Sequence, residues 1–249
     1  MNFFSLFKRN IIYKLKKKIL IDIDKVEGKS LDKLFQFYGS DKGNYFEAGN
    51  TKGHGYSDFY TSQLDNLKDN KINILEIGSY AGSSAAAFVK YFSKANIFCL
   101  DINISNFKYK SEKIHVYGID IKNLSKVKKT LNKIFQENHI NNFDIIIDDG
   151  SHNLKDILLT LNFFFRYLKN NGTFIIEDFK HPNYYEYNKN IDHILVDEFL
   201  NKIEKKIFSS SSIINEADQK FLMDSIDWID TYKGNLSDSD ICFIKKITK

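Results

Sequence analysis

Cysteine and arginine are scarce in this chain of 249 residues. It has two cysteines, Cys99 and Cys242, and two arginines, Arg9 and Arg166. Both cysteines lie in apolar, strand-like segments outside any Cys-x-x-Cys or Cys/His pattern, so we expect two buried thiols and no cysteine-ligated metal. The net charge of +4 comes mainly from lysines, which are scattered apart from one N-terminal cluster. Because nucleic-acid-binding proteins usually present a dense basic face that contains arginine, we expect no nucleic-acid partner.

Long apolar runs are also missing. Charged residues interrupt each apolar segment before it reaches transmembrane length, and no small-residue cleavage site follows the N-terminal segment. We therefore expect a cytoplasmic protein without a transmembrane segment or signal peptide. Residues 4–19 place apolar side chains near helical spacing with lysines opposite, which predicts an amphipathic helix. Such a helix would cover the core or a partner subunit, as in a homodimer, or would lie on a membrane surface.

The length of the chain favours one large α/β domain with an N-terminal extension. We place the extension at residues 1–70, where it would also cover substrate and cofactor, and the main domain at residues 71–249. From residue 72 onward, strand-like and helix-like segments alternate. The predicted strands cover residues 72–77, 96–100, 114–117, 144–147 and 173–176. The predicted helices between them cover residues 83–92, 124–137 and 154–168.

Isoleucine, leucine, phenylalanine and valine fill these strands almost continuously. Continuous apolar strands are typical of a parallel sheet that helices cover on both faces. Together with the strand–helix alternation, this predicts a doubly wound, Rossmann-like α/β fold with a mostly parallel sheet. After a loop at residues 183–190 and a helix near residues 192–209, the segments 225–232 and 241–247 are predicted to pair and to supply an antiparallel edge strand.

A polar, glycine-rich segment lies between two predicted helices near the N-terminus. These helices cover residues 30–37, with Ser30 as the N-cap, and residues 57–67. The segment between them is predicted as a loop and carries Asp41, Lys42, Gly43 and His54, followed by Tyr56. Glycine-rich loops with few core residues are frequently functional, so this segment is a candidate part of the site.

The motif Glu76-Ile-Gly78-Ser79-Tyr-Ala-Gly82 follows the first predicted strand and precedes a helix. Its two glycines permit a tight turn and the close approach of a ligand to the backbone. Asp101 ends the second predicted strand, where a carboxylate can bind two ribose hydroxyls. Asp120 ends the third and would meet an adenine or ribose edge. The motif with these two acids therefore predicts a cofactor site.

The spacing of this motif selects among cofactors. It lacks the middle glycine of the dinucleotide pattern Gly-x-Gly-x-x-Gly, which a pyrophosphate requires. The carboxylate of Glu76 would repel a phosphate and suits a cationic ligand. S-adenosylmethionine carries a sulfonium and an α-ammonium group, which makes it the predicted cofactor. The alternative is an ordinary β–α turn with a buried carboxylate.

Two later strands each end in a pair of carboxylates, Asp148-Asp149 and Glu177-Asp178. Parallel strands deliver such side chains to one edge of a sheet, so Asp149, Glu177 and Asp178 are predicted to bind one divalent cation, with Mg²⁺ as the first candidate. Two vicinal hydroxyls of a substrate would fill its open positions. Adjacent residues point to opposite faces of a regular strand, so Glu177 and Asp178 both reach the cation only if the strand ends there.

His152 lies three residues after Asp149, near a predicted helix start, and is the predicted general base. It would take the proton of a hydroxyl while the oxygen attacks the sulfonium methyl. One alternative is that Asp148 or Asp149 caps the following helix and that His152 is a capping or surface residue. His54 and His181 are alternative bases.

At these residues the chain resembles the metal-dependent sugar O-methyltransferases of macrolide biosynthesis, of the mycinamicin and macrocin type, and relatives labelled cephalosporin hydroxylase. The matching segments are Ser40–Gly43 with His54 and Tyr56, Glu76–Gly82, Asp148–His152 and Glu177–Asp178. The resemblance implies a class I methyltransferase fold, and it implies the same three metal ligands and His152 as the base. It also implies that S-adenosylmethionine is surrounded by Glu76, Gly78, Asp101 and Asp120, with the segment from Asp41 to Tyr56 closing over cofactor or substrate.

The resemblance leaves the acceptor open. The chain is shorter than the antibiotic enzymes, which favours a smaller substrate such as a sugar or a nucleotide-activated sugar for a surface glycan. The first alternative is methylation of a catechol-like or other small diol. An oxygen-dependent hydroxylase and a non-enzymatic subunit that keeps the fold are further alternatives.

Overall fold

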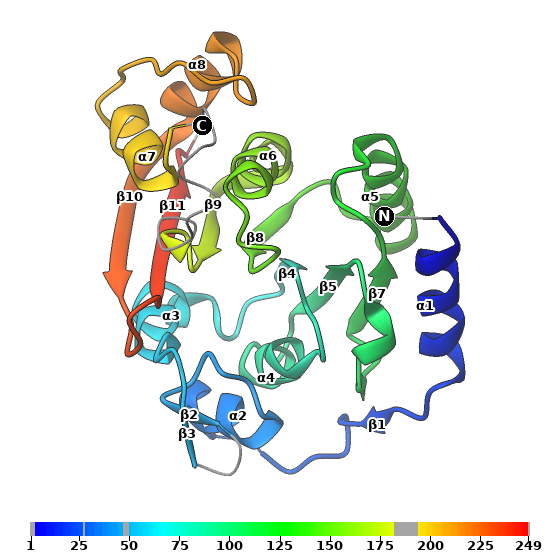
Figure 1. The fold of residues 1–249 in the computed structure, drawn as a ribbon. Helices are drawn as coiled ribbons and strands as arrows, with labels where there is room; N and C mark the ends of the chain where they lie inside the picture. Colours follow the sequence, from blue (N-terminus) through cyan, green and yellow to red (C-terminus); the bar gives the residue numbers. More distant parts are fainter. Residues whose placement is uncertain (1–2, 27, 47–49, 182–193, 249) are drawn as a thin grey trace. The chain divides into compact units, whose positions relative to one another are not determined.

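The computed structural model describes residues 3–26, 28–46, 50–181 and 194–248, which belong to two compact units (Figure 1). Unit 1 covers Met1–Ile140 and unit 2 covers Asn141–Lys249. Among the described helices, none has both the length and the apolar composition needed to cross a membrane. The predicted extension, residues 1–70, lies in unit 1 with the first part of the predicted main domain, and a domain boundary after residue 70 stays a prediction.

The sheet of unit 1 has three parallel strands, with β5 (Asn96–Asp101) between β4 (Asn73–Ile77) and β7 (Ile114–Gly118). All five residues of β4 are buried, as the continuous apolar pattern predicts. The register pairs Asp101 with Gly118, so the ends of β5 and β7 lie level. The chain therefore leaves all three strands at one edge of the sheet, where the predicted cofactor residues follow.

Helices and short elements complete unit 1. These are α1 (Phe3–Leu15), β1 (Ile19–Leu20), α2 (Leu31–Tyr38), β2 (Tyr45–Phe46), β3 (Thr51–Lys52), α3 (Ser57–Leu64), η2 (Asp65–Leu67), α4 (Ser83–Tyr91), η3 (Ile104–Asn106), β6 (Tyr109–Lys110) and α5 (Leu124–Asn138). The ring of Phe88 on α4 contacts the rings of Phe35 and Tyr60, which fixes α2 and α3 against α4. Ser30 caps α2 as predicted, and its hydroxyl accepts a hydrogen bond from the amide of Lys33.

The segment predicted as a loop between α2 and α3 contains a short hairpin. Strands β2 and β3 pair antiparallel, and further backbone hydrogen bonds join the amides of His54 and Tyr56 to the carbonyls of Asp41 and Lys42. Gly53 lies so close to the facing backbone that a Cβ atom there would be 2.2 Å from the carbonyl oxygen of Gly43. The glycines of this segment therefore permit close backbone packing.

In unit 2, β8 (Phe143–Asp148) pairs in parallel with β9 (Leu168–Glu177). Strand β11 (Asp240–Lys246) runs antiparallel to β9 on one side and to β10 (Ile226–Lys233) on the other. The remaining elements are α6 (Leu154–Phe164), η4 (Phe165–Tyr167), α7 (Val196–Glu204) and α8 (Glu216–Ser225). The predicted mostly parallel α/β architecture with antiparallel pairing at one edge is confirmed.

Three details differ from the prediction or lie beyond it. The helix predicted to residue 168 ends at Phe164, and β9 begins at Leu168 rather than at residue 173. Helix α8 was not predicted, because only its cap, Asn215, signals a polar ten-residue helix. The predicted loop at residues 183–190 lies outside the described residues.

Both cysteines are buried and free, as expected, and burial raises the pKa of the Cys99 thiol.

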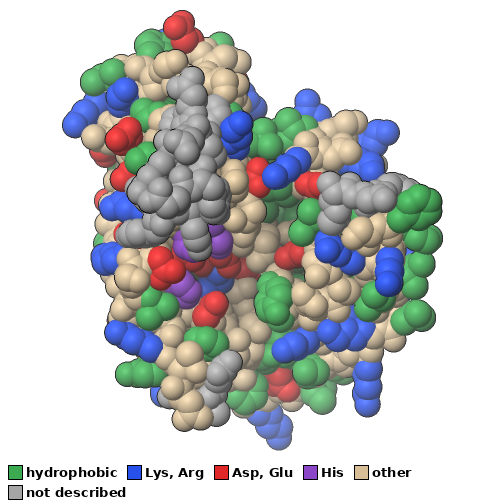
Figure 2. Space-filling model, viewed as in Figure 1, with side chains coloured by type: hydrophobic (Ala, Val, Ile, Leu, Met, Phe, Trp, Pro, Cys, Tyr) green, Lys and Arg blue, Asp and Glu red, His purple; other side chains and the backbone are tan. Residues whose placement is uncertain are grey.

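Lysine and arginine side chains are spread over the face that Figure 2 shows and do not gather into one dense patch. This distribution agrees with the scattered lysines of the sequence. Because a nucleic-acid ligand is held mainly by a clustered positive surface, the absence of such a partner stays a prediction.

His115 on β7 stacks on Phe98 of β5, with ring centroids 4.9 Å apart. Desolvation by burial lowers the pKa of His115, and the carboxylate of Glu137 opposes this shift. As the pH falls through about 6.5, the unfolded chain therefore takes up a proton before the folded chain does, so folding stability falls. The part of the folding stability that depends on neutral His115 is fully present above that pH and is lost below it.

We expect His115→Phe to keep the ring stacking and to remove this pH dependence. The drop in the free energy of unfolding between about pH 7.5 and about pH 5, measured by urea unfolding, should be smaller than in the wild-type protein. His139→Asn is the matched control, because it replaces an exposed histidine at the C-cap of α5. An equal drop in His115→Phe and wild-type protein would contradict this assignment.

Candidate functional site

The loop after β4 is shaped by two glycines in the left-handed region, Gly78 (φ 88°) and Gly82 (φ 78°). The amide of Gly78 donates to the carbonyl of Leu100, and that of Gly82 donates to the carbonyl of Ser79. A Cβ atom on Gly82 would lie 2.4 Å from the ring of Phe107. The loop is therefore a tight turn that leads into α4, as the sequence predicted.

The carboxylate of Glu76 is fully buried at the end of β4. One of its oxygens accepts a hydrogen bond from the hydroxyl of Ser84, at 2.5 Å, in the first turn of α4. Ser79 is also buried, and its hydroxyl donates to the carbonyl of Glu76. A buried carboxyl group thus lies beneath the loop, next to the first turn of α4.

Asp101 connects the end of β5 to the same loop. One carboxylate oxygen accepts from the amide of Tyr80 at 2.7 Å, and the other accepts from the amide of Asn103 at 2.5 Å. Two carboxylate oxygens offer about four acceptor positions, so capacity remains for ribose hydroxyls. The structure therefore brings Glu76, Gly78 and Asp101 together around one loop, as predicted.

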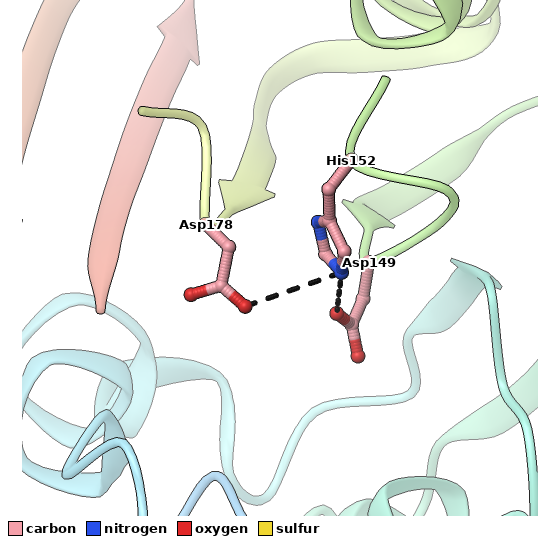
Figure 3. Close-up of side chains that lie close together, drawn as sticks. All are labelled: Asp149, His152 and Asp178. Atoms are coloured by element: carbon pink, nitrogen blue, oxygen red, sulfur yellow. Dashed lines mark ion pairs between the residues drawn. The ribbon is translucent and has the colours of Figure 1, made fainter. Parts of the chain in front are cut away.

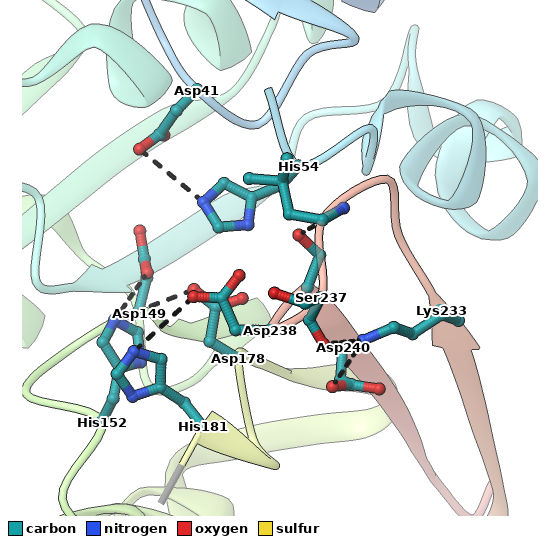
Figure 4. Close-up of polar contacts among 12 residues, drawn as sticks. Asp41, His54, Asp149, His152, Asp178, His181, Lys233, Ser237, Asp238 and Asp240 are labelled. Atoms are coloured by element: carbon teal, nitrogen blue, oxygen red, sulfur yellow. Dashed lines mark hydrogen bonds and ion pairs between the residues drawn. The ribbon is translucent and has the colours of Figure 1, made fainter. Parts of the chain in front are cut away.

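The other predicted cofactor residues lie in different surroundings. Asp120 follows β7, is half-buried, and accepts a hydrogen bond from the amide of Lys122. Tyr56 is fully buried at the start of α3, and its ring stacks on His54 at 5.2 Å between centroids. His54 in turn has its Nε2 atom 4.0 Å from the carboxylate of Asp41 (Figure 4).

Unit 2 carries a group of two carboxylates and one imidazole (Figure 3). The Nε2 atom of His152 lies 3.6 Å from Oδ1 of Asp149 and 4.0 Å from Oδ2 of Asp178. One possible ligand atom from each residue lies within 4.8 Å of the others. Asp149 follows β8 and Asp178 follows β9, so neighbouring parallel strands bring the group together.

Both His152 and Asp178 have a left-handed backbone, with φ 50° at each. For residues other than glycine this conformation is strained, although aspartate and histidine adopt it more often than most. At Asp178 it turns the chain immediately after β9 ends at Glu177. The strand therefore does end at this pair of acids, which was the condition for Asp178 to reach the site.

Glu177 does not belong to the group of ligand atoms that the structure brings together. It is the last residue of β9, pairs with Ile241 of β11, and is 2% exposed. Among the described residues, the group therefore contains an imidazole where the sequence predicted the third carboxylate. Because Glu177 still belongs to the strand, its side chain follows the alternation of the sheet, whereas Asp178 has left it.

The helix-capping alternative for the two aspartates is wrong. The N-cap of α6 is Asn153, whose side chain accepts a hydrogen bond from the amide of Lys155. Asp148 is buried at the end of β8, and desolvation, followed by the nearby charge of Asp149, raises its pKa well above the usual value. Asp149 is therefore the aspartate of this pair that is available to a ligand.

A second histidine lies beside the group (Figure 4). The ring centroids of His181 and His152 are 5.4 Å apart, and Nε2 of His181 lies 3.9 Å from a carboxylate oxygen of Asp238. No local sequence pattern pointed to Asp238, which lies between β10 and β11. Ser84 was also missed, although a serine in the first turn after a glycine loop is a suitable partner for a buried glutamate.

The donors of this group fit a divalent cation. Carboxylate oxygens are preferred ligands of Mg²⁺, and an imidazole nitrogen is a common ligand of transition metals. Asp149 and His152 are about a quarter exposed and Asp178 about a tenth, so a ligand can reach the group. The same imidazole, when not bound to a metal, can accept a proton.

The arrangement of the strands and the glycine loop after β4 define a class I methyltransferase fold. The chain belongs to the ubiE/COQ5 methyltransferase family, whose model matches residues 52–231. The prediction that the chain is a methyltransferase is therefore confirmed at the level of the family.

One curated relative is the L-olivosyl-oleandolide 3-O-methyltransferase of Streptomyces antibioticus, which is 29% identical over 161 residues. That match covers 61% of this chain and 38% of the relative. The MycE methyltransferase of the mycinamycin biosynthetic pathway, solved with Mg, SAH and mycinamycin VI, superposes with a TM-score of 0.64 at 16% identity and covers 89% of this chain. The chain spans 56% of that protein, and at this identity the likeness shows the fold.

We expect Gly82→Ala to weaken both folding and cofactor binding. The free energy of unfolding should fall by about 1–3 kcal/mol from the left-handed backbone alone, with a further loss from the contact with Phe107. Calorimetric titration with S-adenosylhomocysteine should show at least about tenfold weaker binding, because the loop amides move.

Gly28→Ala is the matched control, since Gly28 has a similar φ of 75° and no atom near the added Cβ. It should lose stability by a similar backbone amount and retain the affinity for S-adenosylhomocysteine. Unchanged affinity in Gly82→Ala would show that this turn is not part of a cofactor site.

Proposed function

We propose that the protein is an S-adenosylmethionine-dependent, divalent-metal-assisted O-methyltransferase that acts on a hydroxyl of a sugar. The observation that carries this proposal is the group of Asp149, His152 and Asp178 at the ends of two parallel strands. An acid–imidazole group of this kind suits the removal of a proton from a hydroxyl, which an O-methyltransferase requires and which its cofactor does not provide.

The loop of unit 1 supplies the residues for the cofactor. S-adenosylmethionine, when bound, provides a methyl group on a positively charged sulfur. Glu76 and the left-handed glycines Gly78 and Gly82 would hold its cationic end, and Ser79 lies in the same turn. Asp101 would bind the ribose hydroxyls and Asp120 an adenine or ribose edge. Tyr56 would contribute through the segment that precedes α3.

The group of unit 2 supplies the residues for the acceptor. A divalent cation, most simply Mg²⁺, lowers the pKa of a hydroxyl that it binds. Asp149 and Asp178 would hold the cation, and the role of Glu177 as a third ligand stays a prediction. Nε2 of His152 faces both carboxylates and is the atom that would take the hydroxyl proton. The two carboxylates are close enough to keep the protonated ring in place.

The sugar acceptor is proposed from the curated relative, which is named as an olivosyl-oleandolide 3-O-methyltransferase. A nucleotide-activated sugar for a surface glycan is the specific form that we favour. A catechol-like diol is the second candidate, because two adjacent hydroxyls can bind one cation in the same way. Oxygen-dependent hydroxylases commonly use two histidines and one carboxylate, whereas this group has one histidine and two carboxylates.

We expect His152→Ala to lower the rate of methyl transfer about 10²- to 10⁴-fold, as for the loss of a general base. Its affinity for Mg²⁺, measured by calorimetry, should stay near that of the wild-type protein. Asp149→Asn and Asp178→Asn should each weaken Mg²⁺ binding by at least about tenfold and lose activity in parallel. Chelation of the metal should abolish transfer in the wild-type protein.

Asp238→Asn is the matched control, because Asp238 contacts the neighbouring His181 but lies outside the group. It should keep Mg²⁺ affinity. Loss of Mg²⁺ affinity in His152→Ala would make the histidine a ligand instead of the base, and His54→Ala and His181→Ala then test the other candidates. Methyl transfer that ignores both chelator and His152→Ala would overturn the mechanism.

The acceptor is tested separately. We expect labelled methyl from S-adenosylmethionine to appear in sugars or nucleotide sugars with vicinal hydroxyls, and to be at least about tenfold less in catechols. The reverse preference would leave the metal-assisted mechanism standing and replace the sugar by an aromatic diol.

A further inference from the structure

Helix α1 turns its apolar face away from the rest of unit 1. Phe4, Phe7, Ile11 and Leu15 recur at intervals of three and four residues and so form one stripe along the helix. Their exposed fractions are 76%, 57%, 41% and 81%. The amphipathic helix predicted from the sequence is therefore present, but its apolar side does not cover the core.

The opposite face of α1 makes the contacts with unit 1. Arg9 donates to the carbonyl of Ile102 at 3.1 Å, and the ring of Tyr13 meets the edge of Phe107 with centroids 6.3 Å apart. The side chain of Asn10 lies against Gly118, where a Cβ atom would be 2.6 Å from it. Polar and aromatic side chains thus seat the helix and leave the stripe outward.

Basic residues flank the outward-facing apolar stripe of α1. The first 21 residues contain no aspartate or glutamate, and the first acidic residue is Asp22. They contain six basic residues: Lys8, Arg9, Lys14, Lys16, Lys17 and Lys18. At 100° per residue, Lys8 and Lys14 fall on the two sides of the stripe. Both are exposed.

The exposed apolar stripe and the basic residues beside it decide which kind of partner can bind this face of α1. A second copy of the chain, docked through the same stripe, would bring two sets of six positive charges together. Four side chains from one helix also offer far less area than the roughly 1,200–2,000 Å² of a stable interface between proteins. An anionic lipid surface instead accepts the apolar side chains at the boundary of its acyl chains and attracts the flanking lysines.

We infer that α1 is a peripheral anchor for a membrane surface that carries anionic headgroups. Phe7, Ile11 and Leu15 enter the headgroup boundary, and Lys8 and Lys14 lie at the level of the lipid phosphates. Ile19 and Ile23, which are 53% and 74% exposed, extend the apolar surface beyond the helix. The anchor lies on the membrane and does not span it.

The test is co-sedimentation of the full chain with phosphatidylcholine vesicles, with or without about one third phosphatidylglycerol. We expect binding at least about tenfold stronger to the anionic vesicles, falling several-fold when salt is raised from about 0.1 M to about 0.5 M. Ile11→Ser with Leu15→Ser should remove at least about 90% of this binding, because the apolar stripe is lost. Lys8→Gln with Lys14→Gln should weaken it by roughly 30-fold, at about fivefold for each lysine.

Matched controls change equivalent side chains elsewhere. Ile207→Ser with Phe208→Ser replaces two residues that are 51% and 49% exposed in unit 2, and Lys128→Gln with Lys129→Gln removes two exposed charges from α5. Both control pairs should bind the vesicles as the wild-type protein does. Thermal unfolding should be unchanged in all four variants, since none of the replaced side chains is buried.

Two results would overturn the inference. One is equal binding to neutral and anionic vesicles, or none to either. The other is self-association, seen by sedimentation velocity without lipid, that Ile11→Ser with Leu15→Ser abolishes. That second result would establish this face as the interface of a homodimer. Neither depends on methyl transfer, so the proposed function is judged separately.

Discussion

Two left-handed residues, His152 and Asp178, hold the candidate site of unit 2 in its shape. Each lies just beyond a buried parallel strand, and each sharply redirects the chain so that a polar side chain meets its neighbours. Strain of about 1–3 kcal/mol at such a residue persists only when the surrounding structure stabilises it. Here the strand ends that precede the two residues, Asp148 of β8 and Glu177 of β9, are buried. Strained residues are concentrated at binding and catalytic sites, so their position supports a functional role for this group.

Unit 1 organises its loop by a different means, through carboxylates that accept hydrogen bonds from their surroundings. Glu76 holds the first turn of α4 through Ser84, and Asp101 holds the loop backbone through Tyr80. Both acids therefore act on loop geometry without any ligand. A ligand that binds such a preformed turn loses less free energy to ordering of the protein.

The sequence predicted the fold well because its strongest signals are local. Buried strands such as β4 are continuously apolar, so they could be recognised from the sequence. Because each predicted acid stands where a strand ends, the edge of the sheet that carries the candidate residues could also be predicted. Asp149, His152 and Asp178 were all predicted, but the place of Glu177 was not, because one residue decides whether a side chain still follows the strand. Asp238 reaches His181 from a distant loop, and no local pattern encodes such a contact. The outward orientation of α1 could not be predicted either, because an amphipathic pattern does not show which face of the helix packs against the rest of the protein.

The absence of a side chain at Gly118 limits which substitutions the neighbouring residues tolerate. Gly118 is paired with Asp101 in the sheet, and it leaves the space in which Asn10 seats α1. A side chain at position 118 would require the Asn10 side chain to move from its place beside this strand end. Substitutions at positions 10 and 118 are therefore coupled, because a larger residue at one of them requires a smaller or displaced side chain at the other.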